Sequence, residues 1–235
     1  MTQDEQGKAA AGRSPRAVAA AGVGAAVLVV ALIAGVLFAF PVLQVKSFAV
    51  TGAQQTSAEA VEQATGIKRG DNLVRISATH AAAGVAALPW VEKAQVSRQW
   101  PGTVAVEVSE REAVLAAMVQ GQTHLVDAHG VAFISQDPPE GAVALRGVSG
   151  DDHAVYAAAV AGVQALRAVT PQLAGRLTAV EAASATSMTF IFDSDRQVYW
   201  GSSDRAEDKA RASEVALGRE GNSFNVSNPV MITSR

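Results

Sequence analysis

Residues 88–112 read LPWVEKAQVSRQWPGTVAVEVSERE, which is the pattern of a β-hairpin. In the second half of this stretch valine alternates with smaller or polar residues, as is typical of a strand with one buried face. The pattern predicts strands at 91–99 and 103–110. Pro101 and Gly102 occupy the second and third positions of the turn between them, which predicts a type II turn with a positive φ at the glycine.

The preceding stretch, residues 45–76, reads VKSFAVTGAQQTSAEAVEQATGIKRGDNLVRI and predicts a strand followed by two helices. The strand covers residues 45–51. The first helix ends at Gly66, which supplies a left-handed C-cap, and Ser77 caps a second helix that ends before Pro89. The expected order is strand, helix, helix, strand, strand, which gives a three-stranded sheet with two helices packed on it.

The amino-acid composition argues against several classes of function. The chain has 235 residues, 49% of them hydrophobic and 17% charged, with a formal net charge of -3 and no cysteine. This length allows one or two domains with their own cores, and the near-neutral charge argues against a surface for nucleic acid. Without cysteine there are no disulfides, no thiol catalysis and no Cys-based zinc site. We expect no cofactor.

An apolar segment near the start predicts a membrane anchor. Residues 17–45 carry no charged side chain, and crossing a bilayer takes only ~20 residues. We expect a transmembrane helix over residues 17–43. A cleaved signal peptide is the alternative, but it requires a shorter apolar region and a small-x-small cleavage site, and Leu37 stands two positions before Ala39.

The flanking charges predict the orientation of this anchor. Lys8, Arg13 and Arg16 precede it, whereas only Lys46 lies close behind it. Because the basic flank stays in the cytoplasm, residues 1–16 form a cytoplasmic tail and the rest lies outside. The chain is therefore expected to be a single-pass, type II protein of the cell membrane.

Two further domains are expected outside the membrane, over residues 44–113 and 114–235, so the fold class is α+β. The second domain is strand-rich, with expected strands at 113–119, 123–126, 131–134, 177–182, 188–192, 197–200 and 223–227. One helix is expected from Ser149 or Asp151 to about Val169, and a charged amphipathic one from Arg205 to about Leu217.

One group of side chains suggests a metal or acid–base site. His124, Asp127 and His129 stand within a strand–turn–strand segment, and such residues can hold zinc or transfer protons. Asp127 with Gly130 is, however, also typical of a turn. We interpret this group as structural, and no metalloprotease, phosphate-binding or nucleophile motif occurs in the sequence. The chain is not expected to be an enzyme.

The two quoted stretches resemble the polypeptide-transport-associated (POTRA) domain of the FtsQ/DivIB family of bacterial cell-division proteins. The shared features are the V-x-G that closes the first strand, then G-D-N-L, L-P-W-V, the R-x-W-P turn and the final E-R. They follow one another directly after an N-terminal apolar segment, as in that family. One departure is Ala113, where family members often carry proline. We expect a high-GC Gram-positive source.

The resemblance implies a function without catalysis. Members of this family are division scaffolds at the septum that recruit FtsB-like and FtsL-like coiled-coil partners and thereby help to control the septal peptidoglycan synthase. Partner capture in the family is attributed to the last strand of the second domain. By position this strand is Ser223, Phe224, Asn225, Val226 and Ser227, with Phe224 and Val226 on one face, either as partner anchors or as part of the domain's own core.

A physical mode for such capture is strand addition, because an unpaired sheet edge presents N–H and C=O groups at a fixed spacing. Two other function classes remain open. One is a POTRA-containing component of protein transport, which would need repeated domains and a C-terminal barrel. The other is a membrane-anchored extracytoplasmic hydrolase that uses the group around His124.

Overall fold

The computed structural model describes residues 26–33, 35–36 and 43–234. Within these residues no helix has the length and apolar character needed to cross a membrane. The predicted anchor over residues 17–43 lies mostly outside the described residues, and the cytoplasmic tail lies wholly outside them. Residues 26–33 and 35–36 are helical.

The chain folds as two compact units, each described by itself. The first unit contains the described residues up to Thr51 together with Ala58–Val85 and Ala94–Glu107. The second contains Gly52–Ser57, Ala86–Lys93 and Val108–Arg235.

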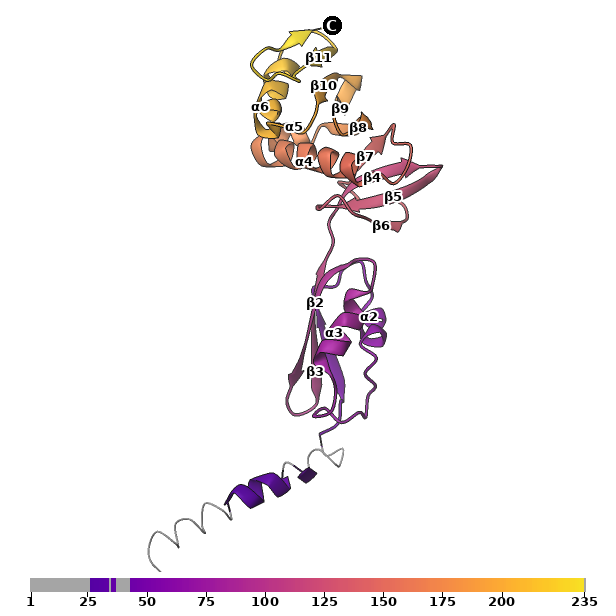
Figure 1. The fold of residues 1–235 in the computed structure, drawn as a ribbon, viewed down its shortest axis with the longest axis vertical. Coiled ribbons are helices and arrows are strands. Elements are labelled where there is room, and N and C mark those ends of the chain that lie inside the picture. Colours follow the sequence, from indigo (N-terminus) through magenta and orange to yellow (C-terminus); the bar gives the residue numbers. More distant parts are fainter. Residues whose placement is uncertain (1–25, 34, 37–42, 235) are drawn as a thin grey trace, which may run out of the picture. The chain divides into compact units, whose positions relative to one another are not determined.

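The first unit has the expected order of elements (Figure 1). Its sheet has the strand order β1-β3-β2, with β1 parallel to β3. The elements that lie wholly or mostly in this unit are β1 (Ser47–Thr51), α2 (Ala58–Ala64), α3 (Ala78–Ala86), β2 (Val91–Gln99) and β3 (Thr103–Glu110). The last residue of α3, the start of β2 and the end of β3 belong to the second unit. The two predicted hairpin strands are confirmed residue for residue.

Buried apolar side chains hold the strands and helices of this unit together. Val104 and Val106 of β3 are fully buried, as are Val61 of α2 and Val85 of α3, so the alternating strand and the two helices supply one core. The helices approach closely because α3 carries a glycine, Gly84. A Cβ added there would lie 2.2 Å from the carbonyl oxygen of Ala64.

The turn between β2 and β3 differs from the predicted type. Gly102 is not among the glycines with positive φ, and the Trp100–Pro101 peptide bond is cis. A type II turn requires positive φ at its third position, so that prediction was wrong. The glycine is needed for space instead, because a Cβ at Gly102 would lie 2.9 Å from the carbonyl oxygen of Gln44 and 3.2 Å from the Lys46 side chain.

The second unit is built on a nine-stranded sheet with the order β12-β11-β10-β9-β8-β7-β4-β5-β6. Its strands are β4 (Ala113–Val119), β5 (Gln122–Asp127), β6 (Ala132–Ser135), β7 (Val143–Arg146), β8 (Leu177–Ser184), β9 (Ser187–Phe192), β10 (Gln197–Gly201), β11 (Ser223–Asn225) and β12 (Thr233–Ser234). Its helices are α4 (His153–Val169), α5 (Pro171–Ala174) and α6 (Ala206–Leu217), and Asp193–Asp195 form a 3-10 turn. The strands β7 and β12 and the helix α5 were not predicted.

The long helix α4 packs closely on this sheet. Asp152 caps its start by accepting hydrogen bonds from the N–H groups of Ala154 and Val155, which agrees with a charged helix start. Where α4 meets the sheet, a Cβ at Gly162 would lie 2.5 Å from the Phe190 ring. Phe190 in turn stacks on Trp200, with ring centroids 4.3 Å apart, and all of these rings are buried.

Candidate protein-interaction edge

The predicted interaction residues lie at one end of the nine-stranded sheet. Ser223–Asn225 form β11, while Val226 and Ser227 follow it. Phe224 is 2% exposed and Val226 is fully buried. The two apolar side chains therefore belong to the core of the second unit, which was the alternative that the sequence left open, and they cannot be surface anchors for a partner.

The strand β11 is not the unpaired edge that the sequence suggested. On one side it pairs in parallel with β10, in the register Val198↔Phe224. On the other side it pairs with β12, in the register Asn225↔Thr233. Among the described residues the outermost strand at this end of the sheet is therefore the two-residue β12, and β6 forms the opposite edge.

Backbone directions follow from one hydrogen bond. The N–H of Val226 donates to the carbonyl oxygen of Tyr199 at 2.9 Å, so it faces β10. Because main-chain groups alternate along a strand, those of Asn225 face β12. By the same alternation Thr233 faces β11, and the N–H and C=O of Ser234 face the open side. These outward groups are the ones that an added strand would meet.

A single arginine fixes β11 in place. The guanidinium of Arg196 donates to the carbonyl oxygens of Leu217, Arg219 and Gly221, at 2.6, 2.8 and 3.1 Å. It also lies 5.4 Å from the centroid of the Phe224 ring, a cation–π contact. Arg196 therefore ties the end of α6 to β11. Sequence reasoning missed it, since its partners stand more than twenty positions away.

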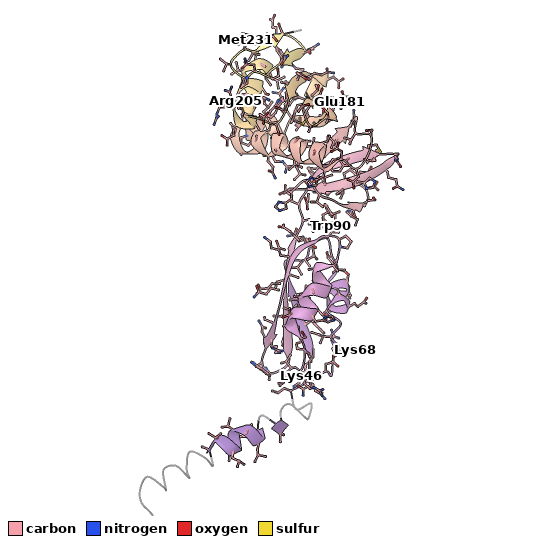
Figure 2. All side chains as sticks on the ribbon, in the orientation of Figure 1. Lys46, Lys68, Trp90, Glu181, Arg205 and Met231 are labelled. Atoms are coloured by element: carbon pink, nitrogen blue, oxygen red, sulfur yellow. The ribbon has the colours of Figure 1, made fainter. Side chains whose placement is uncertain are left out.

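The segment between β11 and β12 presents apolar side chains to solvent. Val230 and Met231 are 82% and 67% exposed, and Val215 of α6 is 53% exposed. Pro229, Val230 and Val215 line a groove of about 330 Å³ together with charged residues in α6 and just before it. Met231 and Arg205, the residue that precedes α6, are labelled in Figure 2. Exposed apolar groups beside an open sheet edge are typical of a protein-binding surface.

The helix α6 beside this groove is held by buried polar contacts. The Lys209 ammonium donates to the carbonyl oxygen of Ser202 at 2.9 Å, and burial lowers the pKa of Lys209. Trp200 donates its Nε1–H to the hydroxyl of Ser213 at 2.9 Å. These bonds attach α6 to the β10 end of the sheet, so the groove has a fixed wall.

The group around His124 has a structural explanation. Asp127 is buried, and its carboxylate accepts the N–H groups of His129 and Val131, at 2.9 and 3.0 Å, and the guanidinium of Arg111. It is therefore committed to the turn and to an ion pair. His124 contacts the hydroxyl of Ser135 at 3.0 Å. No group of side chains suited to a metal ion occurs among the described residues.

Comparison with protein families agrees with this architecture. The family model described as "POTRA domain, FtsQ-type" matches residues 43–111, and "Cell division protein FtsQ/DivIB, C-terminal" matches residues 116–218. The chain belongs to the FtsQ/DivIB family of bacterial cell-division proteins. The FtsQ-type first unit and the FtsQ/DivIB-type second unit are those expected from the sequence.

Individual FtsQ relatives support the assignment. The cell division protein FtsQ of Corynebacterium glutamicum is 35% identical over 213 residues, covering 91% of this chain and 96% of the relative. FtsQ of Mycobacteroides abscessus is 33% identical, covering 88% of this chain and 67% of the relative. FtsQ of Mycobacterium leprae is 32% identical, covering 84% of this chain but 57% of the relative. These are high-GC Actinobacteria, which confirms the expected source.

Proposed function

We propose that this FtsQ/DivIB-family chain is a scaffold of the division machinery that captures an extended segment of a partner protein at the edge of its nine-stranded sheet. The observation that carries the proposal is the two-residue strand β12, whose Ser234 backbone groups face the open side of the sheet. A partner strand placed there would gain main-chain hydrogen bonds, with alternate side chains supplying specificity.

The segment Ser223, Phe224, Asn225, Val226 and Ser227 has a supporting role in this proposal. Its buried side chains hold the edge in register, and Asn225 pairs with Thr233. Asn225 also accepts the N–H of Ser227 at 2.9 Å, which bends the chain away after β11. The partner itself contacts β12 and the exposed Val230 and Met231.

The partners proposed are bitopic division proteins of the FtsB and FtsL types, through which the chain would help to control the septal peptidoglycan synthase. Such proteins carry extracytoplasmic segments that can reach an edge presented outside the cytoplasm. This requires residues 17–43 as an anchor, residues 1–16 in the cytoplasm, and domains over 44–113 and 114–235 outside. The basic residues before the anchor favour this orientation.

We propose no catalytic role, cofactor or metal for this chain. Asp127 is engaged with Arg111 and with the backbone of its own turn, so its carboxylate oxygens are already occupied by structural contacts. A structural role for the whole His124 group fits a scaffold better than a hydrolase.

The experiment is a pull-down of the full chain from detergent-solubilised membranes, with identification of the co-purifying proteins. The proposal predicts small bitopic proteins with heptad repeats. Recovery of none of them, from cells that are dividing and with the bait folded, would contradict the scaffold function.

A further inference from the structure

Five basic residues and an exposed tryptophan gather at one end of the first unit. We call this the basic end; it consists of residues 43–46, 68–76 and 98–102. Its basic side chains are those of Lys46, Lys68, Arg69, Arg75 and Arg98, and it contains one acidic residue, Asp71. Glu62 of α2 pairs with Arg69 at 3.2 Å, so the other basic side chains carry most of the excess positive charge. The chain as a whole carries a net charge of -3, so this positive charge is a local concentration. Figure 2 shows Lys46 and Lys68 at the same end of the unit.

Main-chain hydrogen bonds join the three segments. Val45 donates to the carbonyl oxygen of Asp71 and accepts from Gly70, both at 2.9 Å. Lys46 donates to the carbonyl oxygen of Gly102 at 2.7 Å.

A side chain adds a further link. The Arg98 guanidinium donates to the carbonyl oxygen of Leu73 at 2.9 Å and to that of Ile76. The basic end is therefore one ordered surface with a fixed arrangement of charge.

Trp100 projects from this surface. It is 58% exposed, whereas Trp90 and Trp200 are buried at 8% and 0%. A largely exposed tryptophan loses the hydrophobic gain of burial within its own domain. Its amphipathic ring suits the boundary between water and lipid, where tryptophan is enriched in membrane proteins.

The basic end also stands next to the uncharged segment in the chain. Lys46 follows Pro41 by five positions, a path of at most ~18 Å when fully extended. The hydrogen bond from Lys46 to Gly102 places the Trp100 turn beside that point. If residues 17–43 cross the bilayer, the basic end emerges within reach of the lipid headgroups.

From this geometry we propose that the basic end docks on the headgroups of anionic lipids, with Trp100 in the membrane interface. The inference rests on the anchor in the proposed function but not on strand capture. Basic residues close to a bilayer are attracted by anionic lipids, and the rigid arrangement lets several of them act together. Docking would fix the orientation of the first unit against the bilayer.

The test uses the full chain reconstituted into vesicles whose acyl chains are brominated, because bromine quenches tryptophan fluorescence on contact. Vesicles of phosphatidylcholine alone are compared with vesicles that also contain phosphatidylglycerol. We expect quenching at least about two-fold greater with the anionic lipid, falling as salt screens the charges. In Trp100→Phe this difference disappears, since the two buried tryptophans are insensitive to lipid.

Charge variants test the basic end separately. Lys46→Gln and Lys68→Gln are each expected to lower the ratio of docked to undocked protein roughly five-fold, the effect of one basic residue near an anionic surface. Lys93→Gln is the matched control, because the Lys93 side chain is 80% exposed but lies outside the basic end. It should leave quenching unchanged.

Flotation of the vesicles, measured in parallel, tests membrane anchoring separately from docking of the basic end. Protein that floats with the vesicles but shows equal quenching in both lipids overturns docking and leaves the anchor intact. An acidic protein would then be the better occupant of the basic end. Protein that does not float contradicts the anchor and overturns docking with it.

Discussion

Val226, which directly follows β11, donates its main-chain N–H to the carbonyl oxygen of Tyr199 in β10 at 2.9 Å. Its backbone is therefore part of the hydrogen bonding of the sheet. This relationship decides how the proposed interaction edge can be probed. A change at Val226 acts on the fold of the second unit, whereas a change at Ser234 acts on the open side of β12.

Proline at position 226 is expected to destabilise the second unit. Val226→Pro removes the N–H that Tyr199 accepts and places a proline inside a sheet contact, which should cost roughly 2–4 kcal/mol of unfolding free energy. Val226→Ala is the control, because it shortens the buried side chain and keeps the N–H. Thermal unfolding followed by circular dichroism should give a lower Tm for proline than for alanine, and equal Tm values would contradict the hydrogen-bond assignment.

Gly102→Val is expected to destabilise the first unit through a clash. The added Cβ would lie 2.9 Å from the Gln44 carbonyl oxygen, and crowding of this kind costs about 1–3 kcal/mol. Gly102→Ala should show much of the same loss, because the clash begins at Cβ. An alanine variant that melts with the wild type would mean that the close approach is not the reason for this glycine.

His124 and His129 should be dispensable for partner capture, whereas Asp127 should be needed for stability. Replacing His124 and His129 together by alanine is expected to leave both Tm and partner capture unchanged. Asp127→Asn should instead lower stability by about 3 kcal/mol, because it removes the carboxylate that pairs with the Arg111 guanidinium. Loss of partner capture in a folded double-histidine variant would revive a chemical role for this group.

The carboxylate of Glu110 predicts a pH dependence. Burial raises its pKa, but the N–H groups of Gln55, Thr56 and Gln54 outweigh that effect, and the net pKa is lowered. A lowered folded-state pKa stabilises the protein above the unfolded pKa of glutamate, ~4.3, and the stabilisation is lost as pH falls through the folded-state value.

Glu110→Gln tests this contribution. The difference in Tm between wild type and Glu110→Gln should be largest above about pH 5 and should disappear at lower pH. A gap that is constant across this range would rule out the charged hydrogen bonds as its source.

Local patterns in the sequence were sufficient for much of the fold. The valine alternation located β3 because one face of that strand is buried, and the left-handed cap at Gly66 is confirmed by its φ of 68°. The missed strand β7 has only four residues between two parallel neighbours, so it lacks a clear period. The strand β12 has two exposed residues and no apolar signal.

The candidate site was harder to predict, because its features depend on contacts distant in sequence. The hydrophobic pattern of residues 223–227 indicated a strand, but it did not show whether another strand pairs with each of its sides. Pairing with Thr233–Ser234 moves the edge by one strand. The clamp by Arg196 and the crowding of Gly102 by Gln44 likewise join residues that carry no mutual signal in the sequence.

The most direct test of strand capture compares Ser234→Pro with Ser234→Ala in the pull-down of bitopic partners. Proline removes the outward N–H and is tolerated on an edge strand, whereas alanine removes only the hydroxyl and keeps that N–H. With strand capture at β12, both variants keep the wild-type Tm, Ser234→Ala retains the partner, and Ser234→Pro loses it. A folded Ser234→Pro protein that recovers the partner at the wild-type level would contradict strand addition at this edge.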